Sequence, residues 1–347
     1  MKHFLLTVFA LSFSFQTQAS TDQKITFCFP RGTEELMTLE VLLANEKGYF
    51  KKQGIEINFK GIKGRANILM AVANNQESHC DMGASNIDGL YREELDLNLI
   101  LPVHFFFYGL DYDTHLVTSK KSNIKTIADL KGKTVRLGQA PGQIAFKHML
   151  AEAGLKQSDV KIVLHQKAVQ IADQLENGKM DAGIAWVPVM PVLIAEGNIN
   201  IIEKNVMGRY VMPILPHSFS FVNYEFSKNN PEIVKKFKNA IKEATDFTKA
   251  NPSELIYTFQ RNTKLIGSPD WKVSRVVAER AGELFTGPQA FELADQLTPT
   301  NGKSKTSVIQ CLNDLGKIFF KEGIKSKKAT DKDFTTWLKT MDKLAKK

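Results

Sequence analysis

Short apolar runs alternate with longer amphipathic segments along the first part of the chain. The runs at 24–29, 55–60 and 80–85 are rich in β-prone residues, and segments with helical spacing separate them. Thr33 stands where it can cap the first of these helices, and Gly48 lies just past the helix end. Strands that alternate with helices predict a mostly parallel sheet with right-handed crossovers, so the expected fold class is α/β.

The same alternation begins again further along the chain. Gly178 closes a helix in this second part, where strands are expected at 114–119, 133–138, 160–165 and 181–187. A β-rich segment at 210–223 follows, and apolar residues from Ile233 to Phe247 then recur at helical spacing. We therefore expect two units of similar construction, each with its own sheet.

The chain is expected to cross between these units twice, near residues 112 and 217, and two such crossings predict a hinge. Lobe I would then consist of residues 20–112 and 217–347, and lobe II of residues 113–216. The lysine-rich helices after Trp271 are expected to pack on lobe I.

The amino end has the pattern of an export signal. Lys2 precedes an apolar run at 4–15, and Thr17 and Ala19 are the small residues that a signal peptidase reads. The run is shorter than the roughly 20 residues that a membrane-spanning helix needs. The sequence predicts a signal peptide over residues 1–19, cleaved near Ala19.

The composition and charge of the chain are compatible with the two expected α/β units. The chain has 347 residues, 43% of them hydrophobic, which suits a globular protein of two compact domains. The formal charge of +9 comes with lysines that alternate with acidic and small polar residues near the carboxyl end, as on solvated helix faces. No basic stripe is interleaved with aromatic residues, so a nucleic-acid partner is not expected.

Three cysteines bear on compartment and chemistry. An odd number in an exported chain leaves at least one unpaired. Cys28 and Cys80 fall in strands predicted to be buried and are interpreted as small apolar core residues, while Cys311 lies near the carboxyl end. The sequence leaves the redox state of all three open.

The usual sequence signatures of hydrolytic, metal and redox sites are missing. The chain has no GxSxG, HExxH or CxxC motif. His79, Cys80 and Asp81 are consecutive, so on a strand the cysteine points away from the other two, which is poor geometry for a metal site. A binding protein without cofactor or metal is favoured over an enzyme.

Three phrases carry a resemblance to a known family. "EKGYFKKQGIEINF" (46–59), "DLKGKTVRLGQAPG" (129–142) and "LENGKMDAGIAWVPV" (175–189) stand in the order and spacing found in periplasmic substrate-binding proteins. The chain resembles the subgroup that serves ABC importers of nitrate, alkanesulfonates, taurine and thiamine precursors, the NMT1/THI5-like proteins. The resemblance covers roughly residues 24–250.

The resemblance implies the type II periplasmic-binding fold, in which two α/β lobes close over a small solute. It implies a periplasmic monomer that delivers the solute to an ABC permease. Two alternatives stay open: a solute-reading partner of a membrane signalling protein, and an exported enzyme on the same fold. The yeast-type pyrimidine synthases of this fold rely on a cysteine-rich motif that is missing here, which disfavours the enzyme.

Candidate ligand contacts follow the predicted strands, because ligands of open α/β sheets bind beyond the carboxyl ends of strands. In the first unit these contacts are Arg31, Gly32 and Thr33 after the first strand, and Ser85 and Asn86 after the third. Arg31 could clamp an anion, although acidic residues next to it could simply neutralise it. Ser85 and Asp88 also form a capping box, which would explain the serine at this position without a ligand.

In the second unit the candidates are Gln139, Pro141, Gly142 and Gln143 in a glycine-rich loop, and Trp186 at a strand end. The resemblance implies small hydroxyls in that loop. The two glutamines stand there instead, and amides both donate and accept hydrogen bonds, which admits a neutral heterocycle. The alternative for Trp186 is a half-buried core position.

The segment 104–115, "HFFFYGLDYDTH", lies at the first crossing. Part of its aromatic cluster must be packing, because a strand buries alternate residues. Tyr108, Asp111 and His115 are the candidate ligand contacts, since aromatic faces with nearby carboxylates can hold a flat or cationic ligand. The nature of the solute stays open between a small anion such as a sulfonate and a flat solute such as a thiamine-like pyrimidine.

Overall fold

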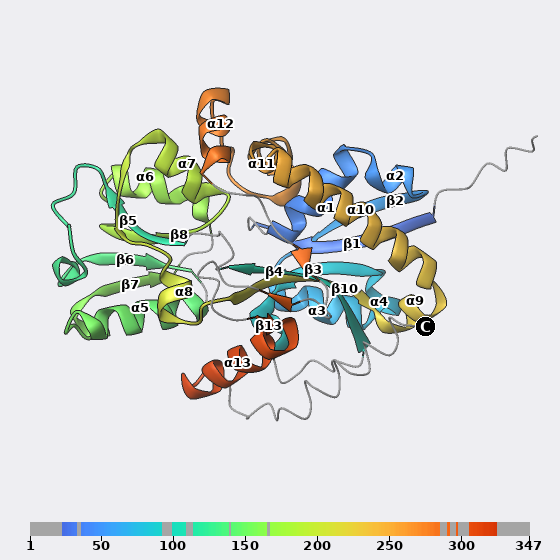
Figure 1. The fold of residues 1–347 in the computed structure, drawn as a ribbon, viewed down its shortest axis with the longest axis horizontal. Coiled ribbons are helices and arrows are strands. Elements are labelled where there is room, and N and C mark those ends of the chain that lie inside the picture. Colours follow the sequence, from blue (N-terminus) through green and yellow to red (C-terminus); the bar gives the residue numbers. More distant parts are fainter. Residues whose placement is uncertain are drawn as a thin grey trace, which may run out of the picture.

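A computed structural model describes residues 23–32, 36–91, 99–108, 114–138, 140–164, 167–284, 290–291, 296–297 and 305–324. Within these residues the chain forms two separate main sheets, one of six strands and one of five, each flanked by helices. Figure 1 shows the two sheets side by side along the longest axis of the molecule. The expected α/β fold with two units is confirmed.

The six-stranded sheet has the order β11-β4-β10-β3-β1-β2. Its strands are β1 (Gln23–Pro30), β2 (Ile55–Ile62), β3 (Met82–Asn86), β4 (Ile100–Tyr108), β10 (Leu215–Asn223) and β11 (Ala290–Phe291). The helices that accompany it are α1 (Leu36–Glu46), α2 (Tyr49–Lys52), α3 (Arg65–Ala73), α4 (Asn75–Ser78), the 3₁₀ helix η1 (Ile87–Tyr91), α9 (Tyr224–Asn229), α10 (Pro231–Ala250) and α11 (Ser253–Ile266).

The five-stranded sheet has the order β7-β6-β8-β5-β9. Its strands are β5 (His115–Ser119), β6 (Thr134–Leu137), β7 (Lys161–Leu164), β8 (Ala182–Ala185) and β9 (Ile199–Glu203). Its helices are η3 (Ile127–Leu130), α5 (Ala140–Glu152), η4 (Gln157–Asp159), η5 (Ala168–Gln170), α6 (Ile171–Glu176), α7 (Val189–Glu196) and α8 (Val206–Tyr210).

In each sheet four strands run in one direction, and the strand that the chain enters from the other sheet runs the opposite way, as does the short β11. β10 is antiparallel to β3 and β4, and β5 is antiparallel to β8 and β9. The chain enters β5 after leaving β4, and it enters β10 after leaving β9 and α8. These two strands therefore start at the edge where their neighbours end. The chain passes from β4 to β5 between Tyr108 and His115, and from α8 to β10 between Tyr210 and Leu215, so residue 217 is already inside β10. The lobe boundaries near residues 112 and 217 stay predictions.

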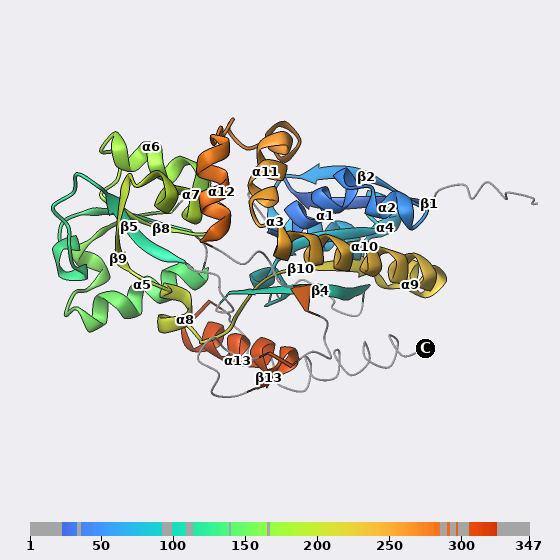
Figure 2. The ribbon, with the colours of Figure 1, turned by 45° about the horizontal axis from the view of Figure 1, so that its top comes forward.

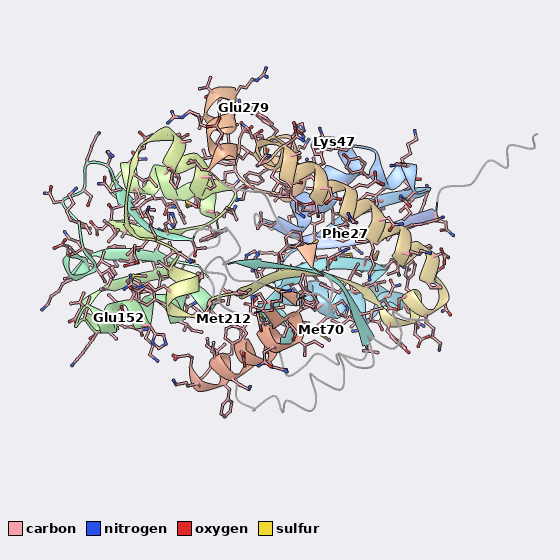
Figure 3. All side chains as sticks on the ribbon, viewed as in Figure 1. Phe27, Lys47, Met70, Glu152, Met212 and Glu279 are labelled. Carbon is pink, nitrogen blue, oxygen red and sulfur yellow. A yellow bond between two sulfur atoms is a disulfide. The ribbon has the colours of Figure 1, made fainter. Side chains whose placement is uncertain are left out.

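A phenylalanine-rich core covers one face of the six-stranded sheet. Phe27 of β1 stacks on Phe237 of α10 at a centroid distance of 5.9 Å, and Phe50 of α2 stacks on the same ring at 5.2 Å. Figure 3 shows Phe27 inside this half of the molecule. The predicted apolar stripe of α10 is buried from Ile233 to Ala244, whereas Phe247 at its end is only half-buried. Burial of this stripe supplies the stability that helical propensity alone does not.

The interpretation of two cysteines as separate apolar core residues is wrong. Cys28 of β1 and Cys80, two residues before β3, form a disulfide with a Cα–Cα distance of 5.8 Å. Both are fully buried, so their burial was foreseen, but their pairing depends on β1 and β3 being neighbours in the sheet. Cys311 is a buried free thiol, and burial raises its pKa to about 11.

The C-terminal helices touch both halves of the molecule. α12 (Arg275–Glu283) packs between α11 and α7, whereas α13 (Val308–Lys321) packs on β10 and reaches α5. Figures 1 and 2 place α12 and α13 on opposite sides of the molecule. The expected contacts with the first unit are present, and the contacts with α7 and α5 of the second unit are additional. A short ladder of β12 (Gln296–Leu297) and β13 (Thr306–Ser307) precedes α13.

Candidate functional site

The candidate site lies where the ends of the two sheets face each other across the crossings. On one side are the carboxyl ends of β1 and β3 and the start of β10; on the other are the carboxyl ends of β6 and β8 and the start of β5. The chain between Tyr108 of β4 and Thr114, just before β5, spans at most about 22 Å. The two edges are therefore held close, and strand ends are where open α/β sheets bind ligands.

An aspartate fixes the same pair of strands in each sheet. Asp81 accepts a bond from the backbone N–H of Thr26 through Oδ2 at 2.8 Å, and Asp181 accepts one from Thr134 at 2.7 Å. Each aspartate also donates its own N–H to the same threonine's carbonyl. Asn86 lies five residues after Asp81, and Trp186 lies five residues after Asp181. These two side chains therefore occupy equivalent ends of the facing edges, an amide on one side and an indole on the other.

The turn after β1 is tied to the end of α11. The N–H of Gly32 donates to the carbonyl of Ile266 at 2.6 Å, and Gly32 has a φ of 92°. A Cβ atom at Gly267 would lie 2.9 Å from Cγ of Arg31, so the arginine stem runs directly over this glycine. Arg31 is exposed, and Thr33 lies outside the described residues. This packing fixes the arginine stem.

Ser85 and Asn86 are the last residues of β3, and the expectation that they follow the strand is wrong. β3 continues through Asn86 because Asn86 pairs with Ser218 and Ser85 pairs with Phe219 of β10. Ser85 is 1% exposed and Asn86 5% exposed. A partner strand from a distant part of the chain thus extends β3 beyond what its own residues indicate.

His217 and Ser218 are site candidates that the sequence did not single out. Nδ1 of His217 lies 3.1 Å from Oγ of Ser218, which is buried beside Asn86 in the sheet. The available signal was the expected second crossing near residue 217, because the start of the strand that returns to the first sheet lies next to the other sheet; β10 begins at Leu215.

The loop after β6 becomes the first turn of α5. Pro141, Gly142 and Gln143 belong to this helix, and Nε2 of Gln143 donates to the carbonyl of Gly138 at 3.4 Å. Gly142 is buried, and a Cβ there would lie 3.5 Å from Cε of Met207 in α8. Gln139 lies outside the described residues. In the structure Gln143 therefore stabilises the turn through this hydrogen bond.

Trp186 is half-buried at the end of β8 and lies against the backbone of Gly138. A Cβ at Gly138 would lie 3.3 Å from two carbons of the indole ring, so the glycine leaves room for the ring. The ring also packs against the apolar core of the second sheet. The structure is therefore compatible with Trp186 as a core residue and as a ligand contact. Part of the side chain packs in the core, and part is exposed at the sheet edge.

Some residues of the aromatic segment at the first crossing are buried in the core, and others lie at the edge of the candidate site. Phe105 and Phe106 are buried in β4, which confirms that part of the cluster is packing. His104 is also buried, which lowers its pKa to about 3 and keeps it neutral. His115 starts β5, where its Nδ1 accepts from the N–H of Asn205 at 3.3 Å. Tyr108 ends β4, and Asp111 lies outside the described residues.

The described residues contain neither a metal-binding cluster nor a helix that could span a membrane. Histidine, cysteine, aspartate and glutamate side chains do not gather there in a group of three that could hold a metal ion. Among the same residues, each helix is too short or too polar to cross a bilayer.

Residues 38–255 match the family model described as NMT1/THI5 like, which is well over half of the chain. The chain belongs to this family. Among curated family relatives, it is 26% identical over 225 residues to the 4-amino-5-hydroxymethyl-2-methylpyrimidine phosphate synthase THI13 of Saccharomyces cerevisiae. The matched segment covers 62% of this chain and 64% of the yeast protein, a little under two thirds of its length.

Solved structures of periplasmic binding proteins share the fold. The aliphatic sulphonate-binding protein SsuA of Escherichia coli is 15% identical, with a TM-score of 0.62 over 89% of this chain and 91% of SsuA. The nitrate-binding protein NrtA of Synechocystis PCC 6803 is 12% identical, with a TM-score of 0.58 over 92% of this chain and 85% of NrtA. At this identity the likeness establishes the fold, and the type II periplasmic-binding architecture expected from the sequence is confirmed.

Proposed function

We propose that this protein captures a small organic solute between its two halves and delivers it to an ABC permease. The observation that carries the proposal is the pair of facing sheet edges, with buried Ser85, Asn86 and Ser218 on one and Trp186 on the other. Polar groups that fix orientation, together with an aromatic surface, are the usual composition of a small-molecule site.

The solute that this composition suits has a flat or apolar portion and hydrogen-bonding groups. An indole face contacts flat groups, while Asn86 and the hydroxyls can both donate and accept. The sulphonate- and nitrate-binding neighbours in the fold support a small solute with polar oxygens, and the similarity to a pyrimidine phosphate synthase supports a pyrimidine-like one.

Capture would proceed by closure of lobe I, residues 20–112 and 217–347, on lobe II, residues 113–216. A solute that contacts both edges stabilises the closed form over the open one by its difference in affinity. The protein would act as a periplasmic monomer after loss of residues 1–19, which lie outside the described residues. The buried Cys28–Cys80 disulfide supports export, because disulfides persist in oxidising compartments.

The test begins with a thermal-shift screen of sulfonates, nitrate and pyrimidines, followed by calorimetry on each compound that raises the melting temperature. Trp186→Leu should lower the affinity at least tenfold. Trp271→Leu is the matched control, because Trp271 is also half-buried but packs on Phe259 of α11. Both variants lose side-chain packing, so both should have a lower melting temperature than the unaltered protein. Equal affinities in the two variants would contradict the proposed site.

A second candidate function is an enzymatic one, favoured by the similarity to the yeast synthase. An enzyme would change a bound compound over many turnovers, whereas a binding protein returns it unaltered. Mass spectrometry of each compound after incubation with purified protein distinguishes the two. A product formed in excess of the protein concentration would replace the binding proposal with an enzymatic one.

A further inference from the structure

The C-terminal helix α13 is anchored on the six-stranded half. The hydroxyl of Tyr91 donates to the carbonyl of Leu312 at 2.7 Å, and its ring meets Phe319 edge to face at 5.2 Å. A Cβ at Gly316 would lie 3.1 Å from the Tyr91 ring, so the glycine lets the ring lie close to the helix. Tyr91 ends η1, which directly follows Asn86. The helix is thus fixed to the segment that leaves the candidate site.

The other end of the same helix contacts the five-stranded half. Glu322, the residue after α13, accepts a bond from Nζ of Lys147 at 2.7 Å and lies 3.1 Å from Nε2 of His148. The glutamate side chain is only 7% exposed, while the lysine and histidine are about half exposed. The hydrogen bond from Lys147 holds the pKa of the Glu322 carboxyl below its usual value, so this carboxylate is charged at neutral pH.

The position of Glu322 is unfavourable for α13 itself. It caps the carboxyl end of the helix, where the helix dipole disfavours a negative charge. Lys147 and His148 offset this cost, and both lie on α5 of the other half. In this state the carboxylate is therefore stabilised from across the molecule and not by its own helix.

α5 carries this contact directly to the candidate site. Its first turn holds Pro141, Gly142 and Gln143, and Lys147 is one helical turn beyond Gln143. Lys147 and the first turn belong to one continuous helix, so the element that meets Glu322 is the one that carries these site candidates.

The contact on the opposite side of the molecule is of a different kind. α12 meets α7 through Val192, Ala195, Ala278 and Ala281, each at most 4% exposed, with Ile256 of α11 behind them. Glu279 of α12, labelled in Figure 3, bonds instead to Tyr257 and Ser253 of α11. α12 is thus fixed to α11 by polar bonds, and small apolar side chains form its packing against α7.

We propose that Glu322, Lys147 and His148 form a latch that holds the two halves closed, with the α12–α7 contact as the pivot. Release of the solute requires the latch to break, while the apolar contact stays packed. This inference rests on the proposed solute-capturing function, since a latch is useful only if the halves open and close. It assigns the C-terminal helix the role of controlling how long the solute is held.

The test measures opening in the protein without any solute. Spin labels at Lys51→Cys and Gln157→Cys, exposed positions on the two halves, report the distance between them by pulsed electron resonance. Glu322→Gln should add a second population at longer distance and shift the open-to-closed ratio about fivefold, the equivalent of ~1 kcal/mol for a partly exposed ion pair. The double variant with Glu322→Lys and Lys147→Glu should restore the original distribution.

Asp314→Asn is the matched control. Asp314 lies on the same helix, but its partners Gln310 and Lys317 are also on α13. It removes one carboxylate without touching the other half, so its distance distribution should equal that of the unaltered protein. Should Glu322→Gln unfold α13, Lys147→Gln makes the same test from α5. Distributions unchanged by both variants would overturn the latch, and since no solute is used, this outcome is independent of the solute-binding proposal.

Discussion

The indole ring of Trp186 lies directly against Gly138, close enough that a Cβ on the glycine would stand 3.3 Å from the ring. This contact joins the ends of β8 and β6, two neighbouring strands of one sheet. It explains why the strand end before the glycine-rich loop carries a glycine: a larger residue would displace the aromatic surface that we place at the site.

Gly138→Ala should therefore move the Trp186 ring by a few tenths of an ångström. We expect the free energy of unfolding to change by less than about 1 kcal/mol, because the ring is only half-buried, while solute affinity falls. Gly142→Ala provides the comparison for stability alone, since its Cβ would make an ordinary 3.5 Å contact with Met207. Calorimetry and urea unfolding of both variants check this. Unchanged affinity in Gly138→Ala would remove Trp186 from the site.

The Cys28–Cys80 disulfide should contribute substantially to stability. It closes a loop over a sequence separation of 52 residues, and the chain-entropy relation gives about 4 kcal/mol for such a loop. Cys28→Ala with Cys80→Ala should lower the free energy of unfolding by that order in urea titrations. The control is Cys311→Ala, the buried free thiol, which retains the disulfide. If reducing agent destabilised the double variant as much as the unaltered protein, the disulfide would not be the cause.

Glu40 should make stability fall as the pH rises. Its carboxyl is fully buried in α1, where Thr248 donates to Oε1 at 3.2 Å, and burial raises its pKa from 4.5 to about 8. The folded state then keeps a proton that the unfolded state loses, so the stabilisation is complete below pH 4.5 and disappears by about pH 8. The difference is roughly 5 kcal/mol at most.

Glu40→Gln should remove this dependence, because glutamine resembles the protonated acid. Urea unfolding at pH 5 and pH 8 measures it, with the exposed Glu56→Gln as control. Buried His104, with its pKa of about 3, acts in the opposite direction and costs stability as the pH falls below 6.5. The difference between Glu40→Gln and the unaltered protein therefore isolates Glu40. Parallel pH profiles of the two would refute the buried-acid interpretation.

Asp181 should support the fold of the second sheet. Asp181→Ala leaves the N–H of Thr134 without its charged acceptor, and a partly buried bond of this kind is worth about 1–3 kcal/mol. Asp81→Ala should cost a similar amount in the first sheet. Asp270→Asn, which breaks only an exposed ion pair with Lys272, should change the free energy of unfolding by less than about 0.5 kcal/mol. A loss in Asp181→Ala no larger than in Asp270→Asn would contradict this structural role.

The strands and helices of this protein are largely readable from local pattern. The apolar stripe of α10 and the strand at 24–29 were predicted at nearly their observed bounds, because period and burial coincide there. Asn86 is a residue whose position local pattern does not predict. Its place inside β3 depends on pairing with Ser218, a residue more than a hundred positions away.

The sequence singled out candidate site residues that follow a strand, and also His115 in the aromatic segment at the first crossing, but it passed over His217 and Ser218. Arg31 and Trp186 stand at carboxyl ends of predicted strands, so topology alone marks them. His217 is the third residue of β10, and only the reversed direction of this strand brings it to the same edge.

By itself the sequence determined the α/β class, the two units and the family, because these depend on periodicity and on phrases that are contiguous in the chain. The tertiary structure alone decided the Cys28–Cys80 pairing, the neighbours Asn86 and Ser218, and the contact of Glu322 with Lys147 and His148. Each of these joins residues far apart in the chain, and local pattern carries no information about which distant segments pack together.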